Sequence, residues 1–122
     1  MLIIDDAYNA SPESMLAAFD AIADRPREGR RFAVLGQMSE LGSLAQSSHE
    51  RVGRRAAEVF DAVAVVDTEL GRTLATAADA HLLPDREAAV VWVKNHARRG
   101  DLVLIKASHG VHLDTVVEEL TR

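Results

Sequence analysis

The sequence predicts one α/β domain of three layers, in which a mostly parallel sheet lies between two layers of helices. Short β-rich apolar runs alternate with segments of helical periodicity along the whole chain, which is typical of successive β-α-β units. The length of 122 residues is that of a single domain with a substantial core. A hydrophobic content of 48% is ordinary for a globular domain, and no repeat or low-complexity segment interrupts the pattern.

The first strand is predicted at Leu2–Ile4, because three apolar residues precede a polar cluster. Ser11 is placed to cap a helix, with Pro12 in its first turn, where the missing N–H costs nothing. Apolar residues three and four apart give this helix one buried face, formed by Met15, Phe19 and Ile22. A polar turn at Asp24–Gly29 ends it, and Phe32–Leu35 is the second strand.

A polar loop, Gln37–Gln46, precedes Ser47, which we expect to cap the second helix in a capping box with Glu50. Asp85 is the expected cap of a later helix, which should end near the basic residues Arg98 and Arg99. The other predicted elements are a strand at Ala62–Val66, a helix at Glu69–Ala78, a short edge strand at His81–Leu83, a strand at Leu102–Ile105, and a last helix with Leu113, Val116, Val117 and Leu120 on its packed face.

Composition excludes several classes of protein. The chain has no cysteine, so it has neither a disulfide framework nor a thiolate metal site, and we expect a cytoplasmic location. A net charge of −5 argues against nucleic acid as a partner, and no apolar run is long enough to span a membrane. Histidines at 49, 81, 96 and 112 lack the spacing of metal ligands, and we expect most of them on the surface.

Polar side chains follow two of the predicted strands directly. Asp5 and Asp6, with Tyr8 and Asn9, come after the first strand, and Lys106 to Gly110 come after the fifth. Ligands of open α/β sheets bind outside the carboxyl ends of the strands, so both clusters are candidate sites. The acidic pair could hold a metal, contact a ribose hydroxyl, act as a base or simply cap the loop. The second cluster suits an anion or carboxylate.

A third loop at a strand end, Gly36–Gly42, is rich in glycine. It lacks the Gly-Lys-Ser/Thr ending of a phosphate-binding P-loop and the G-x-G-x-x-G spacing of a dinucleotide fingerprint. From these residues alone a structural role is favoured over ligand binding.

Two families are similar to this pattern, and the first is the two-component receiver domain. An acidic pair after the first strand, Asp67 after the third and Lys106 after the fifth have counterparts there. However, the interval of 61 residues from Asp6 to Asp67 is long for a phosphoacceptor, and no proline follows Lys106. The receiver therefore stays a minor alternative, as does a binding module without catalytic activity.

The second resemblance is closer. D-D-A-Y-N-A-S-P-E-S-M at residues 5–15, A-V-L-G-Q-M-S-E-L-G at residues 33–42 and G-D-L-V-L-I-K-A-S-H-G at residues 100–110 resemble three signatures of the MurF-type Mur ligases. His49 and Gly53 fall where that family has a histidine and a glycine. The three signatures occur in the right order and cover the chain from end to end.

The resemblance implies a Rossmann-like C-terminal domain, residues 1–122, that closes as a lid over a nucleotide. The ATP-binding central domain and the N-terminal UDP-sugar domain have no counterpart here, and Met1 directly before a strand suggests a piece of a longer protein. The whole enzyme would join D-alanyl-D-alanine to UDP-N-acetylmuramoyl-tripeptide through an acyl phosphate, with ATP and Mg²⁺ bound mainly by the central domain. We expect a monomer.

The resemblance also assigns site residues, none of them catalytic and none a metal ligand. Residues expected beside the ribose, adenine and phosphates are Asp6, Tyr8 and Asn9. Residues expected toward the dipeptide or the closing phosphates are Lys106, Ser108, His109, Met38 and Glu40. The sequence departs from the family pattern at Ser11, Gln37, Ala107 and His109, where the family has Asn, Asp, Gly and Arg. Because His109 is a weaker cation than arginine, anion binding by the last loop is less firmly implied.

Overall fold

The computed structural model describes residues 1–6 and 10–122 as a three-layer α/β/α domain. Its strands are β1 (Leu2–Asp6), β2 (Arg31–Leu35), β3 (Ala62–Val66), β4 (His81–Leu83) and β5 (Leu102–Lys106). Its helices are α1 (Pro12–Ala23), α2 (Ala45–Val59), α3 (Glu69–Ala78), α4 (Arg86–His96) and α5 (Asp114–Thr121), with short 3₁₀ turns η1 (Gly42–Leu44) and η2 (His109–Val111).

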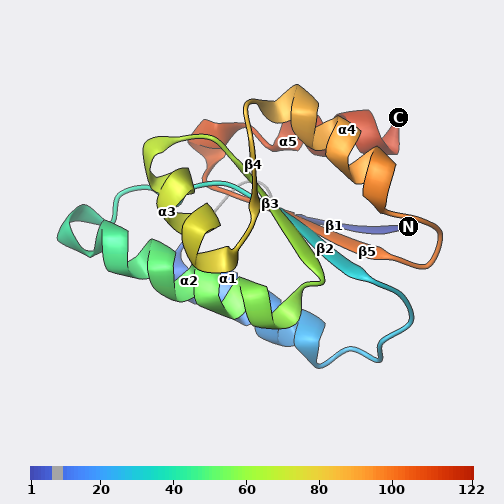
Figure 1. Ribbon diagram of the computed structural model, residues 1–122, viewed down its shortest axis with the longest axis horizontal. Helices are drawn as coiled ribbons and strands as arrows, with labels where there is room; N and C mark the ends of the chain where they lie inside the picture. The colour runs from blue at the N-terminus through green and yellow to red at the C-terminus, as the bar shows by residue number, and fades with distance from the viewer. Residues whose placement is uncertain (7–9) are drawn as a thin grey trace.

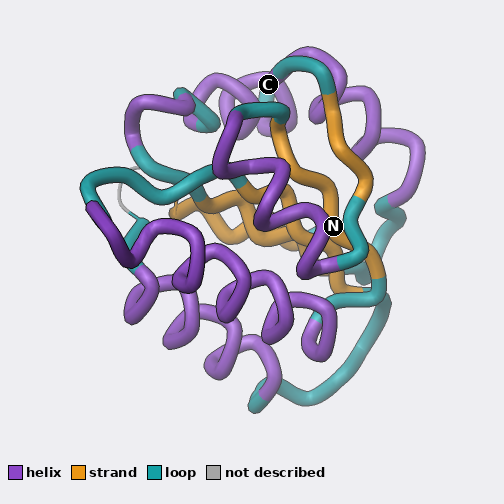
Figure 2. Tube along the Cα trace, turned by 60° about the vertical axis from the view of Figure 1, so that its left-hand side comes forward, coloured by secondary structure: helices purple, strands orange, loops and turns teal. Residues whose placement is uncertain are grey.

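The sheet is parallel throughout, with strand order β1-β5-β2-β3-β4. Helices α1, α2 and α3 cover one face, and α4 and α5 cover the other (Figure 1). Figure 2 shows the strands enclosed between these two helical layers. Right-handed crossovers explain the division, because the chain advances from β1 to β4 over one face and returns to β5 over the other. The predicted fold class is therefore confirmed.

The strand order excludes the receiver domain. Receivers order their strands 2-1-3-4-5, which places the first strand inside the sheet and the fifth at its edge. Here β1 is an edge strand and β5 lies between β1 and β2. Asp67, the counterpart of the phosphoacceptor, forms an ion pair with Arg72 of α3 at 2.7 Å.

Each face of the sheet has its own apolar core, because successive strand residues point to opposite faces. On β2, Ala33 and Leu35 pack toward α1–α3, whereas Phe32 and Val34 pack toward α4 and α5. The first core also includes Met15, Phe19, Ile22, Val52, Ala56, Val63, Leu74 and Leu104. The second also includes Ala64, Ala89, Trp92, Val93, Val103, Ile105, Leu113 and Val116.

Most predicted boundaries agree with the structure. The predicted bounds of β3, α3 and β4 coincide with the observed ones. Ser11 caps α1 in a capping box with Ser14, in which the backbone N–H of each residue donates to the side-chain hydroxyl of the other. The Asp85 carboxylate caps α4 by accepting from the N–H of Ala88 at 2.8 Å. Strand β1 continues to Asp6, β5 continues to Lys106, and α4 ends at His96.

The predicted start of α2 is wrong. The helix begins at Ala45, without a side-chain cap, because the 3₁₀ turn η1 leads directly into it. Ser47 consequently lies inside the first turn, where its hydroxyl donates to the Leu44 carbonyl at 3.2 Å instead of capping. Most of the four histidines were expected at the surface; His81 and His112 are exposed, whereas His49 is fully buried.

Gly53 allows α2 and α3 to approach closely. A Cβ atom built on Gly53 would lie 2.6 Å from the Cβ of Ala77 and 2.8 Å from the Leu74 carbonyl oxygen. At an ordinary helix position, Gly→Ala stabilises a protein by about 0.5–1 kcal/mol. We expect Gly53→Ala to lower the free energy of unfolding by about 1–3 kcal/mol instead, since one partner is rigid backbone. Urea unfolding measures this change, and a rise in stability would contradict the close packing.

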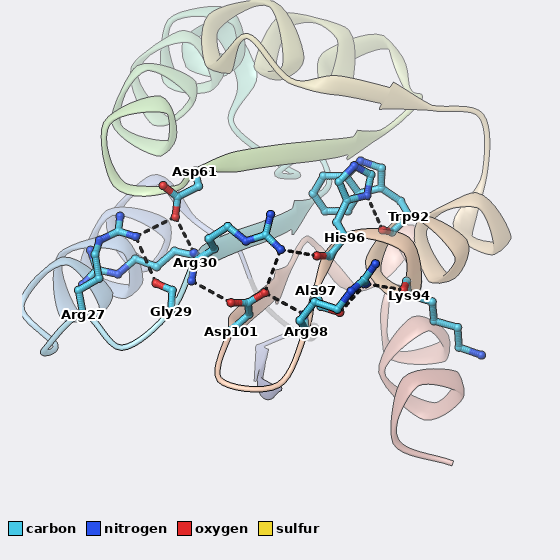
Figure 3. Close-up of polar contacts among 11 residues, drawn as sticks. Arg27, Gly29, Arg30, Asp61, Trp92, Lys94, His96, Ala97, Arg98 and Asp101 are labelled. Atoms are coloured by element: carbon cyan, nitrogen blue, oxygen red, sulfur yellow. Dashed lines mark hydrogen bonds and ion pairs between the residues drawn. The ribbon is translucent and has the colours of Figure 1, made fainter.

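At the amino ends of the strands, Asp101 joins two loops (Figure 3). Its buried carboxylate accepts from the N–H of Arg98 at 2.8 Å and from the N–H of Arg30 at 2.9 Å. These backbone hydrogen bonds lower the pKa of Asp101. Because the folded-state pKa lies below the unfolded one, this stabilisation is complete above the unfolded pKa of about 3.9 and is lost as pH falls through the folded value. The hydrogen bonds of Asp101 thus lie at the amino ends of the strands, whereas the candidate site lies at their carboxyl ends.

Candidate functional site

The candidate site lies at the carboxyl ends of β1, β5 and β2. Asp6, Lys106 and Leu35 occupy one register row across these three strands. The connection that leaves β5 crosses the α4/α5 face, whereas those that leave β1 and β2 cross the opposite face. The chain therefore diverges on both sides of β5, and such topological switch points are where open α/β sheets bind ligands.

Asp6 and Lys106 form an ion pair across the β1–β5 ladder, between Lys106 Nζ and Asp6 Oδ2. The Lys106 side chain is 1% exposed, whereas that of Asp6 is 46% exposed. A buried ammonium group is stable only beside compensating charge and hydrogen-bond partners. The sequence resemblance placed Asp6 beside the nucleotide and Lys106 toward the dipeptide or the closing phosphates. The structure joins the two residues in one ion pair, in which Lys106 is buried and not a solvated cation.

The loop after β5 carries Ser108 and His109. Ser108 is buried, and its Oγ has no hydrogen-bond partner among residues 1–6 and 10–122. A buried hydroxyl without a partner is costly, which makes this group available to a ligand or water. His109 is exposed at the start of η2, with its ring 5.4 Å from that of His112. Of these two predicted residues, His109 lies at the surface and Ser108 just beneath it.

The loop after β2 is held tightly against the loop after β5. The Gly36 N–H donates to the Lys106 carbonyl and the Ser108 N–H donates to the Gln37 carbonyl, each at 3.1 Å. A Cβ on Gly36 would lie 2.7 Å from the Cβ of Ala107. These contacts fix the start of the loop after β2 beside the end of β5 and the residues that follow it.

Met38 and Glu40, both predicted to line the dipeptide side, differ in position. The Met38 side chain is fully buried in the first core, so in this structure it supports the loop and does not face a ligand. Glu40 is exposed and has a φ of 61°. A residue with a side chain is strained in that left-handed region, by about 1–3 kcal/mol, and such strain concentrates at ligand sites.

His49 is a residue that sequence reasoning missed. Its Nε2 accepts from the N–H of Met38 at 2.9 Å, and its Nδ1 lies 2.7 Å from the Ala45 carbonyl oxygen. Burial lowers the pKa of His49, although the hydrogen bond to Ala45 opposes the effect. A signal was present, because His49, Val52 and Ala56 are spaced three and four apart on the buried face of α2.

Two predicted nucleotide contacts, Tyr8 and Asn9, lie outside the described residues. In the part of the chain that is described, no group of three or more His, Cys, Asp or Glu side chains could hold a metal ion. None of the described helices is both long and apolar enough to cross a membrane.

Comparisons with known proteins agree on one relationship. The family model described as "Mur ligase, glutamate ligase domain" matches residues 1–109. The UDP-N-acetylmuramoyl-tripeptide–D-alanyl-D-alanine ligase of Bacillus subtilis is 39% identical, over 97% of this chain and 27% of the relative. The ligase of the same name from Mycobacterium tuberculosis strain CDC 1551 is 38% identical, over 97% of this chain and 28% of the relative.

A solved structure supports the same relationship. The MurF ligase from Thermotoga maritima, in complex with ADP, matches with a TM-score of 0.83 and 32% identity, over 97% of this chain and 27% of that one. This chain thus spans little more than a quarter of the length of the proteins it matches.

Proposed function

Because this chain belongs to the Mur ligase family through its glutamate ligase domain, we propose that it is the C-terminal domain of an ATP-dependent ligase. The enzyme would add D-alanyl-D-alanine to UDP-N-acetylmuramoyl-tripeptide, in the synthesis of a peptidoglycan precursor. The observation that carries this assignment is 39% identity to a ligase with this substrate pair, maintained over 97% of the chain. The three strand-end loops of the candidate site all lie within the matched region.

We propose that the carboxyl edge of the sheet forms one wall of a nucleotide site. Asp6 is half exposed, and Lys106 neutralises its charge, so its carboxylate can accept from a ribose hydroxyl without repelling the phosphates. Ser108 offers a buried hydroxyl with no partner in the described ranges 1–6 and 10–122. These features fit a nucleotide. Tyr8, Asn9, His109 and Glu40 stay predicted contacts, and the buried Met38 would act only through the loop.

The reaction would require a second wall supplied by the rest of the enzyme. ATP would activate the tripeptide carboxylate as an acyl phosphate, and the dipeptide amine would displace phosphate to give the amide. Such chemistry depends on positioning and charge neutralisation, and a domain that closes over the reactants excludes water. We propose that Mg²⁺ binds outside this domain, and that the enzyme is a cytoplasmic monomer.

The test uses the full-length protein that contains this chain. With ATP, Mg²⁺, UDP-N-acetylmuramoyl-tripeptide and D-alanyl-D-alanine, we expect one ADP and one phosphate for each amide formed. Omission of either UDP-N-acetylmuramoyl-tripeptide or D-alanyl-D-alanine should abolish phosphate release. The 122-residue chain alone, assayed in parallel, should show no turnover.

Replacement of the dipeptide by glutamate tests the choice of substrate, because the description of the matching family model names glutamate. Amide formation with glutamate and none with D-alanyl-D-alanine would overturn the proposed substrate. Binding of ADP without any turnover by the full-length protein would instead support a binding module that lacks catalytic activity.

A further inference from the structure

We propose that His49 is a positioning residue of the candidate site, which holds the loop between β2 and α2 in its ligand-ready geometry through the backbone N–H of Met38. This inference deepens the proposed function and rests on it for its kinetic consequences. Its structural part stands on the contacts of His49 alone.

The two hydrogen bonds of His49 determine the protonation of its ring. The Met38 N–H can only donate, so Nε2, 2.9 Å away, must present a lone pair. The Ala45 carbonyl can only accept, so Nδ1, 2.7 Å away, must carry the proton. The geometry therefore requires a neutral imidazole with its proton on Nδ1. A second proton, on Nε2, would face the Met38 N–H and break that contact.

Three consecutive residues, Gly36, Gln37 and Met38, are held in place at the start of the loop, and His49 makes one of these contacts. Gly36 and Gln37 are bonded to the backbone of the loop after β5, and Met38 is held by its buried side chain and by His49. The next two residues, Ser39 and Glu40, are exposed. Strained residues such as Glu40 persist only where the surroundings hold them firmly. Loss of the His49 contact would therefore release the exposed tip of the loop at the site.

The buried environment of His49 favours the neutral ring. Burial lowers its pKa, the hydrogen bond to the Ala45 carbonyl opposes this effect, and neither contribution comes from a charged side chain. The unfolded chain binds a proton near pH 6.5 and the folded chain only at lower pH. Stability from this group is thus complete above pH 6.5 and decreases as pH falls toward the folded pKa.

Two substitutions separate positioning from packing. In His49→Gln, the side-chain carbonyl can accept the Met38 N–H, but the residue no longer titrates. In His49→Leu, a side chain of similar volume fills the space and offers no acceptor. His96→Gln is the matched control, because His96 Nδ1 also contacts a helix carbonyl, that of Trp92 at 2.7 Å, on the opposite helical layer.

The first measurement is amide hydrogen exchange at Met38 in the full-length protein. We expect His49→Leu to accelerate exchange at least about tenfold relative to amides of β3, because a local hydrogen bond is lost. His49→Gln and His96→Gln should stay within about threefold of the parent. Unchanged exchange in His49→Leu would overturn the proposal, whether or not the protein is a ligase.

The second measurement is the rate of dipeptide addition against pH. At pH 8, we expect His49→Leu to reduce kcat/KM by about 10- to 100-fold, and His49→Gln to retain most of it. As pH falls through the folded-state pKa of His49, which lies below 6.5, the parent should lose rate more steeply than His49→Gln, since only the parent has a ring that can be protonated there. Faster exchange in His49→Leu with unchanged kinetics would overturn the positioning role. Absence of turnover in the parent would instead refute the proposed function.

Discussion

Asp6→Asn is expected to destabilise the domain more than Lys106→Met, although the two residues form one ion pair. The asymmetry follows from burial, because Lys106 is 1% exposed and Asp6 is 46% exposed. Without Asp6, the buried Lys106 ammonium loses the negative charge of the carboxylate that contacts it. Removal of one partner from a buried pair costs about 3–5 kcal/mol, and the half exposure of Asp6 reduces our expectation to about 2–4 kcal/mol.

Lys106→Met leaves the opposite situation. Methionine fills much of the space of the buried lysine without its charge, and the remaining Asp6 carboxylate, which is 46% exposed, can be hydrated. We expect Lys106→Met to lower the free energy of unfolding by about 1 kcal/mol or less. The free energy of unfolding of the double variant should lie closer to that of Lys106→Met than to that of Asp6→Asn. Urea unfolding of the four proteins at pH 7 measures these differences as a double-mutant cycle.

A surface ion pair provides the control for this cycle. Asp20 and Arg55 join α1 to α2 at 2.9 Å with both side chains substantially exposed. Asp20→Asn should cost less than about 1 kcal/mol. If Asp6→Asn proved as mild as Asp20→Asn, Lys106 would not depend on Asp6 for its charge compensation. Equal losses in Asp6→Asn and Lys106→Met would contradict the burial asymmetry.

The location of the site could be predicted from the sequence because parallel strands bring their carboxyl ends to one edge. Asp6 and Lys106 are far apart in the chain, yet both follow apolar runs, so their proximity follows once the strands are recognised. The sequence pattern does not reveal how deeply each of these side chains is buried. Lysine is rarely buried, so only the central place of β5 in the sheet reveals that Lys106 lies inside.

The errors at α2 arise from local alternatives that the sequence leaves open. Ser47 and Glu50 have the spacing of a capping box, but the chain enters the helix two residues before Ser47 through η1, which begins at Gly42 with a φ of 57°. His49 is the buried exception among the histidines, and its spacing to Val52 and Ala56 places it on the packed face of α2. A polar residue on an otherwise apolar face indicates a buried hydrogen bond, and here that bond reaches Met38.

Gly36→Ala is expected to disrupt the contact between the two loops of the site, with a loss of about 1–3 kcal/mol in the free energy of unfolding. The backbone of Gly36 does not require a glycine, because its φ lies outside the left-handed region. The cost comes from crowding, since the new methyl group would lie 2.7 Å from the Cβ of Ala107 and 3.0 Å from a methyl group of Val111. If the full-length protein has the proposed ligase function, the displaced loops should also lower its kcat/KM by about tenfold or more.

The crowded partner can be removed, which makes the cause testable. Ala107→Gly deletes the nearest atom, so we expect the double variant Gly36→Ala/Ala107→Gly to be more stable than the sum of the single losses predicts, by at least about 1 kcal/mol. Gly110→Ala is the matched control in the same loop, since no atom of residues 1–6 and 10–122 outside its immediate neighbours lies within 4 Å of its added Cβ. It should change stability by less than about 0.5 kcal/mol. Additive losses in the double variant would mean that Gly36 is required for a reason other than its contact with Ala107. A positive coupling, together with recovered kcat/KM for the proposed reaction, would show that Gly36 is required because it allows the close approach of these two loops.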